Sequence, residues 1–325
     1  MPKSKLKRAL ADYNVRRYII LLGILALMLL GFSTQSKVYV TLANFTNVAS
    51  KYTEIGLLSA GMTLIILTGD IDLSVGSIMC FSAYTCGMLM QSNVPIAIAV
   101  AVALLAGLAV GLLNGFMIAK LKMQSIIVTL GTMTFIRGLC YVFKAGGNMR
   151  GFPDAGFYDF GSGKLLGFIP YSFTLLCLIF LIMSVIFSKT RMGMDLKAIG
   201  NNASAAAFSG INVSNYKMAL FSFNGLMSGL AGVIILSRMQ GIEASLGTGY
   251  EFDAITMCLL GGISIQGGKG TLLGTFLGII VIAYLKSGMN FAQISAYYQS
   301  AILGFIILLS VVIGNLETGK VRQAK

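Results

Sequence analysis

The chain has 325 residues, of which 56% are hydrophobic and 11% are charged, with a mean hydropathy of +0.84 and a net charge of +13. Soluble globular domains carry about 25% charged residues, so this composition excludes an ordinary soluble protein. The sequence has no histidine, which excludes catalytic triads and zinc sites that depend on imidazole. We therefore expect no catalytic residue and no metal site.

Uncharged apolar runs, taken in chain order, predict ten helices. Lipid favours helices because every backbone polar group must bond internally, and one crossing takes about 20 apolar residues. Two of the predicted segments, 55–69 and 254–268, are short. The sequence thus predicts an all-α integral membrane protein with one transmembrane domain over residues 1–325 and helices centred near residues 26, 60, 81, 107, 133, 179, 228, 259, 278 and 305.

Lysine and arginine residues predict the orientation, because cytoplasmic segments of membrane proteins are enriched in them. With the N-terminus in the cytoplasm, sixteen of these residues fall on cytoplasmic segments and seven outside, so we expect both termini in the cytoplasm. The expected cytoplasmic segments are the basic N-terminus 1–17, the loop 189–217 and the C-terminus 317–325. The positive charge indicates topology and contact with anionic membrane lipid, and does not indicate nucleic-acid binding.

The stretch LTGDIDLSVGS places two carboxylates, Asp70 and Asp72, between apolar runs. We expect Asp72 to cap the following helix by accepting backbone N–H groups. A proton or ion relay, and a contact with a partner protein, stay open as alternatives. Aligning IDLSVGSIMCFSAYTCG with FDAITMCLLGGISIQGG pairs Asp72 with Asp253, a further helix-junction acid, and indicates an inverted repeat.

Polar residues within the predicted spans are candidates for lining a transport pathway: Asn114, Arg137, Asn224 and Gln299. Hydrogen bonding between helices, or for Arg137 a structural role near the membrane surface, explains them as well. Glycines spaced by four, such as Gly107 and Gly111, predict close helix packing within one subunit, with a dimer seam as the alternative. The segment GGKGT lacks the residues of a phosphate loop, so we expect a tight turn there.

The segment MGMDLKAIGNNASAAAFSGINV contains one short predicted helix in an otherwise loop-like region. Alanines favour a helix over 203–207, Asn201 or Asn202 can cap its start, and Gly210 can end it. A helix of this kind between spans presents a smooth surface to a partner. We therefore predict contact with an energy-supplying subunit through Gly200, Asn201, Ala203, Ala206, Ala207 and Gly210.

Three long motifs resemble the permeases of ribose-type bacterial ABC transporters: LTGDIDLSVGS, where Asp70 replaces a usual glycine, AIGNNASAAAFSGINV, and GTGYEFDAITMCLLGGISIQGGKGTLLGTFLG. The resemblance covers nearly the whole chain. It implies a type II-like importer fold in the bacterial inner membrane and a permease subunit for a simple sugar or related small polar solute. Ribose, xylose, arabinose, galactose, a deoxy sugar and AI-2 all stay open.

The resemblance also implies partners. ATP would be bound by a separate subunit, usually with two ATPase domains in tandem, so we expect no cofactor on this chain. A periplasmic or lipid-anchored binding protein would deliver the solute, and a second permease chain, identical or related, would complete the pathway. The alternative is a stand-alone ion-coupled secondary transporter that uses Asp70 and Asp72 and needs no ATP.

Overall fold

The structure is a computed structural model that describes residues 13–143, 149–150 and 155–323. In this part of the chain it contains thirteen α-helices, α2 to α14, so the predicted all-α class is confirmed. Residues 1–12 and 324–325 of the expected cytoplasmic tails lie outside the described residues, and residues 317–323 continue α14 as helix. Short strands pair as β1 (Met149–Arg150) with β4 (Gly241–Ile242) and β2 (Lys164–Leu165) with β3 (Ile169–Pro170).

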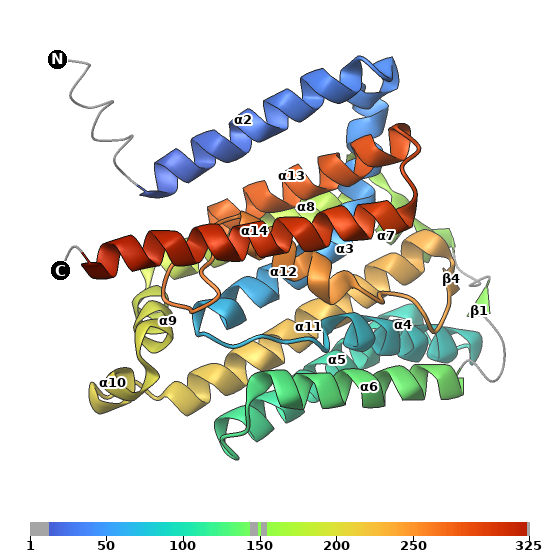
Figure 1. Ribbon diagram of the computed structural model, residues 1–325. Helices are drawn as coiled ribbons and strands as arrows, with labels where there is room; N and C mark the ends of the chain where they lie inside the picture. Colours follow the sequence, from blue (N-terminus) through green and yellow to red (C-terminus); the bar gives the residue numbers. More distant parts are fainter. Residues whose placement is uncertain (1–12, 144–148, 151–154, 324–325) are drawn as a thin grey trace.

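Two long helices, α3 (Leu42–Leu67) and α11 (Val213–Met239), form the centre of the bundle (Figure 1). Twenty of the 26 residues of α3 are buried, so this helix meets protein on nearly every side. Its hydroxyl groups stay satisfied because Thr53, Ser59 and Thr63 each bond the carbonyl four residues back. A central helix of this length can transmit a displacement from one end of the molecule to the other.

The predicted short helix over 55–69 is wrong, because α3 begins at Leu42 and passes through Lys51 and Glu54. Glu54 is buried within the helix and pairs with Arg238 of α11, with 2.9 Å between Oε1 and Nε. A charge that looked like the end of a span is therefore neutralised inside the bundle. The second short segment contains a short helix, α12 (Tyr250–Leu260), but this helix begins before residue 254 and ends at Leu260, so the second half of 254–268 is not helical.

On one side of the central pair lie α4 (Val75–Gln91), α5 (Ile96–Ala119) and α6 (Ser125–Phe143) (Figure 1). Helix α5 packs on α11 along glycines: a Cβ on Gly111 would overlap the Phe221 carbonyl, and a Cβ on Gly225 would overlap the Gly107 carbonyl. The predicted packing of small residues within one subunit is confirmed. Such close backbone contact fixes α5 and α11 as one unit.

On the other side, α12 and α13 (Leu272–Phe291) pack on α3, α2 (Tyr13–Ser33) packs on α13, and α14 (Ala296–Gln323) covers α12. Helix α8 (Tyr171–Lys189) contacts both α3 and α13. The turn between α12 and α13 uses Gly267, Gly268 and Gly270, all at positive φ. This is the tight turn that the sequence predicts.

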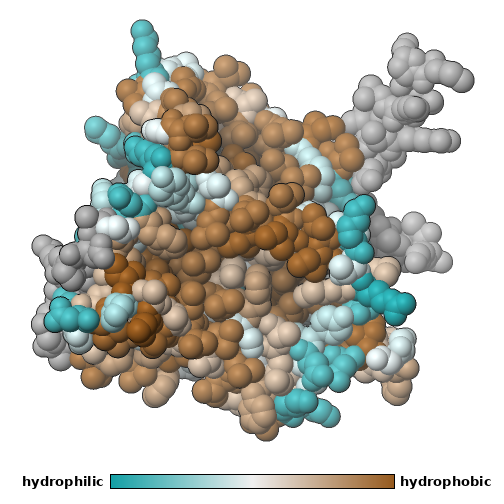
Figure 2. All heavy atoms as spheres, turned by 180° about the vertical axis from the view of Figure 1, so that it is seen from behind, coloured by the Kyte–Doolittle hydropathy of each residue, from teal (hydrophilic) through white to brown (hydrophobic). Residues whose placement is uncertain are grey.

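Six helices of the described chain are long and apolar enough to cross a membrane: α2 (from Asn14), α5, α6, α8, α11 and α13. In Figure 2 hydrophobic surface covers the broad middle of the molecule, and hydrophilic residues gather toward the two sides at which the helices end. Outward-facing side chains such as Phe135 and Leu181 stay largely exposed. An apolar belt of this extent is typical of a surface in contact with lipid.

The two ends of the bundle differ. At one end lie α9 (Arg191–Asn201) and α10 (Ala203–Phe208), together with the start of α2 and the end of α14 (Figure 1). At the other end lie β4 and the strand β1, with α7 (Ala155–Ser162) nearby. We call these the α10 end and the β4 end.

Candidate coupling site and buried polar network

Two short helices at the α10 end carry the predicted coupling segment. Thr190 caps α9, and Asn202 caps α10 by accepting the Ala205 N–H at 3.0 Å. Gly210, with φ of +87°, follows the end of α10. The short helix, its asparagine cap and its glycine end are confirmed. The rest of this segment is not loop-like as expected, because α9 runs to Asn201 and α11 begins at Val213.

One face of α10 is open to solvent. Ala203 and Ala207 are exposed, and Phe208 is 93% exposed, whereas Ala206 is buried. Ala206 therefore faces the protein and cannot itself touch a partner. A phenylalanine left almost fully exposed beside alanines forms an apolar surface that sequence reasoning missed, because it treated the segment as free of bulky side chains.

Gly200 and Asn201 lie against the turn between α12 and α13. A Cβ on Gly200 would overlap the Leu67 carbonyl at the end of α3, and that carbonyl accepts the Gly268 N–H at 2.9 Å. The Asn201 side chain lies beside Gly268. Gly200 thus fastens α9 to the end of α3, since no larger residue fits there.

Helix α9 is also tied to α11. The Tyr216 hydroxyl donates to Asp195 Oδ2 at 2.6 Å. One residue further along α11, Lys217 pairs with Asp70 at 2.7 Å between Nζ and Oδ2. Both central helices are therefore connected to α9, and Asp70 is held by an ion pair between the α3 end and the α11 start.

Asp72 is fully buried at the start of α4. Its Oδ1 accepts the Ser74 N–H at 2.9 Å and the Ser74 hydroxyl, and its Oδ2 accepts Asn224 Nδ2 at 2.8 Å. Oδ1 thus binds the N–H of Ser74, the N-cap residue, in a turn before α4, and Oδ2 binds α11. A capping side chain would accept an N–H from the first turn of the helix, so the predicted cap is wrong and Asp72 holds the turn that precedes α4.

The network continues through Asn114, whose Nδ2 donates to the Ser74 hydroxyl and whose Oδ1 accepts the Thr132 hydroxyl. It joins α4, α5, α6 and α11 within the bundle. Asn224 lies eleven residues into α11, which places it about 16 Å from the start of that helix. Asp72 therefore lies at a helix junction deep in the bundle.

At the β4 end, Arg137 and Asp253 have partners of their own. Arg137 Nη1 donates to the carbonyls of Ala244 and Leu246 at 2.8 and 2.6 Å, which holds the segment before α12 against α6. Asp253, in the first turn of α12, pairs with Lys286 of α13. Gln299, at the start of α14, donates to Asn290 Oδ1 at 2.8 Å and to the Ile294 carbonyl.

Comparison with known proteins identifies the family. Residues 44–311 match the family described as "Branched-chain amino acid transport system / permease component". The chain belongs to this permease family. It is the permease component of an ABC importer, in which a partner subunit handles ATP, and it is a multi-pass protein of the bacterial cell membrane. Membership in this permease family excludes the alternative of a stand-alone secondary transporter.

The relatives are similar over most of their length. The ribose import permease protein RbsC of Escherichia coli (strain K12) is 36% identical over 87% of this chain and 89% of its own. The L-arabinose ABC transporter permease protein AraH of Azospirillum brasilense is 32% identical over 100% of this chain and 96% of its own length. The autoinducer 2 import system permease protein LsrC of Yersinia enterocolitica is 34% identical over 91% of this chain and 81% of its own length. No solved structure matches the chain.

Proposed function

We propose that this permease imports a simple sugar or a related small polyol. The observation that supports this substrate class is the agreement among its relatives. Proteins 32–38% identical to this chain over at least 85% of it are named for import of ribose, L-arabinose or autoinducer 2. Ribose and L-arabinose are small, neutral and rich in hydroxyl groups.

The proposed topology has ten spans, with α3, α4, α12 and α14 added to the six long apolar helices, and the α10 end in the cytoplasm. The excess of lysine and arginine on that side supports this orientation. The start of α2 and the end of α14 lie at the same end. The pairs α3–α4 and α11–α12 each join a long helix to a shorter one through a non-helical segment, which supports an inverted repeat of the type II-like fold.

The proposed coupling site is α10, seated in a groove of the ATPase subunit. Its exposed Phe208, Ala203 and Ala207 would contact the partner, and Gly210 allows the chain to leave the helix. Motion of the ATPase would pass through α9 to both central helices, because Gly200 packs on the end of α3 and Asp195 bonds α11. Gly200 and Ala206 act here as packing residues.

The proposed complex holds further partners. An ATPase subunit with two tandem domains would bind at the α10 end, a periplasmic or lipid-anchored binding protein would dock at the β4 end, and a second permease chain, identical or related, would complete the pathway. Anionic lipid would contact the basic residues at the α10 end.

Uptake of radiolabelled sugars tests this function. Cells that express the chain with its ATPase and binding protein should take up one member of a panel of ribose, xylose, arabinose, galactose, a deoxy sugar and AI-2, and depletion of ATP should stop it. Phe208→Asp should abolish uptake at unchanged protein level, since Phe208 makes no buried contact. Leu121→Asp, at a 58% exposed apolar residue on the turn after α5, is the matched control. Uptake that survives loss of the ATPase would contradict the proposal.

A further inference from the structure

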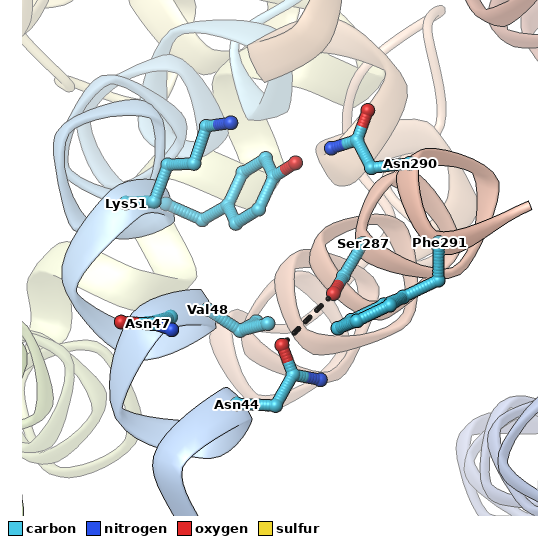
Figure 3. Close-up of a pocket in the computed structure, with 8 residues that line it drawn as sticks. Asn44, Asn47, Val48, Lys51, Ser287, Asn290 and Phe291 are labelled. Atoms are coloured by element: carbon cyan, nitrogen blue, oxygen red, sulfur yellow. Dashed lines mark hydrogen bonds between the residues drawn. The ribbon is translucent and has the colours of Figure 1, made fainter. Parts of the chain in front are cut away.

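A polar hollow opens at the β4 end between the first turns of α3 and the last turns of α13 (Figure 3). Its volume is about 250 Å³, and its lining includes Asn44, Lys51, Tyr52, Ser287, Asn290 and Phe291. Asn44 lies 23 residues before Leu67 on α3, so the hollow is about 35 Å from the α10 end. It therefore lies on the side from which an imported solute arrives in the proposed topology.

The floor of the hollow is made of fixed hydrogen-bonding groups. Asn44 Nδ2 donates to the Tyr39 carbonyl at 2.7 Å, and its Oδ1 accepts the Ser287 hydroxyl at 3.3 Å. Both side chains are buried. The amide oxygen of Asn44 and the Ser287 oxygen keep lone pairs for a further donor, because each oxygen can accept two hydrogen bonds.

The rim carries two donors that face the hollow from opposite helices. In Figure 3 the Lys51 ammonium and the Asn290 amide nitrogen point toward the space between α3 and α13. Gln299 orients Asn290, because Gln299 Nε2 donates a hydrogen bond to Asn290 Oδ1 at 2.8 Å. The Asn290 Nδ2 group therefore faces the hollow. Lys51 makes no ion pair with any carboxylate of the described chain. Gln299, a sequence candidate for the pathway, is thus a positioning residue.

An aromatic ring forms the apolar side of the hollow. Phe291 packs edge-on against Tyr39 of η1 (Lys37–Val40), with 6.0 Å between ring centroids. Tyr39 is itself fixed, since its hydroxyl donates to the Tyr284 carbonyl at 2.8 Å. Burial, followed by the nearby Tyr284, raises the pKa of Tyr39 to about 12. The ring of Phe291 is therefore held in place beside the polar groups.

We infer that this hollow is a binding site for one neutral polyhydroxylated solute, occupied as the solute passes from the binding protein into the permease. The inference rests on the proposed function. Amide groups offer both donors and acceptors, as a sugar hydroxyl does, and an aromatic ring suits the apolar face of a sugar ring. The volume is below the 300–1,000 Å³ typical of sites for drug-sized ligands, which fits a single small sugar.

The lining favours a neutral solute over an anion. Lys51 is the single cation among the residues of the hollow, and the other polar groups that line it are neutral amides and hydroxyls. Phosphate groups are usually held by several cationic or backbone N–H donors. A lipid headgroup that reaches the hollow is the competing occupant, and the experiment separates it from a sugar.

Protection of a cysteine from labelling tests the inference. Asn47→Cys, at an exposed residue of the lining, is made in the complete complex with Cys177→Ala, because the other four native cysteines are buried. The complex is reconstituted in nanodiscs and reacts with a maleimide, with and without millimolar amounts of the sugar that the native complex transports. Gln91→Cys is the control, an exposed amide position at the β4 end of α4.

The transported sugar should slow labelling at residue 47 and leave residue 91 unchanged. Asn290→Ala should raise the sugar concentration for half-protection by about fivefold, the usual effect of one lost hydrogen bond. Gln299→Ala should raise it less, and Gln299→Glu, which cannot donate to Asn290, should match the alanine variant. A structural role alone would leave the half-protecting concentration unchanged.

Three results would overturn the inference. If the native complex transports a sugar that gives no protection, the hollow is not its site although the proposed function stands. If phosphatidylglycerol protects residue 47 and the sugar does not, the occupant is a lipid headgroup. If no sugar of the panel is transported, the proposed function and this inference fail together.

Discussion

At the scale of single residues, the buried carboxylate of Asp72 determines how four helices meet. Its two oxygens accept three hydrogen bonds, from the Ser74 N–H, the Ser74 hydroxyl and Asn224 Nδ2. We predict that Asp72→Asn lowers the melting temperature of the permease, because the new NH₂ group meets another donor on one side. An unsatisfied buried donor costs about 1–3 kcal/mol. The pH dependence of uptake by the remaining folded protein should not change.

Fluorescence-detected size exclusion after heating measures this effect, with Asp159→Asn at an exposed position of α7 as the control. The double variant Asp72→Asn, Asn224→Asp should recover part of the lost stability, since it restores a donor–acceptor pair between the two side chains. A normal melting temperature together with lost pH dependence would favour the proton relay instead.

The sequence predicted which residues are unusual but not what they contact. Asp72 stands out in an apolar chain, and its place before α4 predicts a cap. Asn114 and Asn224 were predicted as pathway candidates because the sequence shows which polar residues lie within a span. It does not show which residues they contact. Asn224 is 152 residues from Asp72, and only the packing of α11 on α4 brings them together. The hollow was missed for the same reason, since α3 and α13 supply its residues from distant segments.

At the scale of elements, two ion pairs join α3 to α11: Asp70, just after the end of α3, pairs with Lys217 near the start of α11, and Glu54, midway along α3, pairs with Arg238 near the end of α11. Hydropathy located all ten predicted helices but misjudged the length of α3, because a charge ends an apolar run whether or not a partner neutralises it. The Glu54 side chain is 1% exposed and that of Arg238 is 23% exposed. Water can therefore reach Arg238 but not Glu54, so losing one partner has a different cost from losing the other.

We predict that Arg238→Ala destabilises the permease more than Glu54→Gln does. The first change leaves a buried carboxylate unpaired, which costs about 3–5 kcal/mol in comparable sites. The second leaves a partly exposed guanidinium that water can still solvate. Thermal melting of the two variants measures the order, with Arg191→Ala at an exposed position of α9 as the control. Equal losses would mean that water reaches Glu54 as well.

Two adjacent alanines in α10 allow packing within the permease and contact with the ATPase to be tested separately. Ala206 is buried and Ala207 is exposed. Ala206→Glu should reduce the amount of folded permease, since a carboxylate would be forced against the bundle. Ala207→Glu should leave folding intact and abolish stimulation of the ATPase by the loaded binding protein. Expression and ATPase assays on both variants check this, and full stimulation in the Ala207→Glu complex would remove α10 from the proposed coupling site.

At the scale of the whole molecule, the two ends of the bundle carry different tasks, and orientation in the membrane decides which partner meets which end. The α5–α6 turn lies at the same end as α10, because the Ser214 hydroxyl at the start of α11 donates to the Ala119 carbonyl at 3.2 Å. The far end of α4 and the segment η1 lie at the β4 end. Gly200 cannot report on sidedness, since it has no room for a side chain.

We predict that single cysteines at Lys120 and Ser209 react with a membrane-impermeant maleimide only after the cells are opened, whereas cysteines at Lys37 and Ser92 react in intact cells. All four positions are exposed, so access depends on the side of the membrane and not on packing. The same reagent on opened cells, where all four should react, is the control for reactivity. Labelling of Ser209→Cys in intact cells would reverse the orientation. The ATPase site would then lie at the β4 end, and the polar hollow would release the solute instead of receiving it.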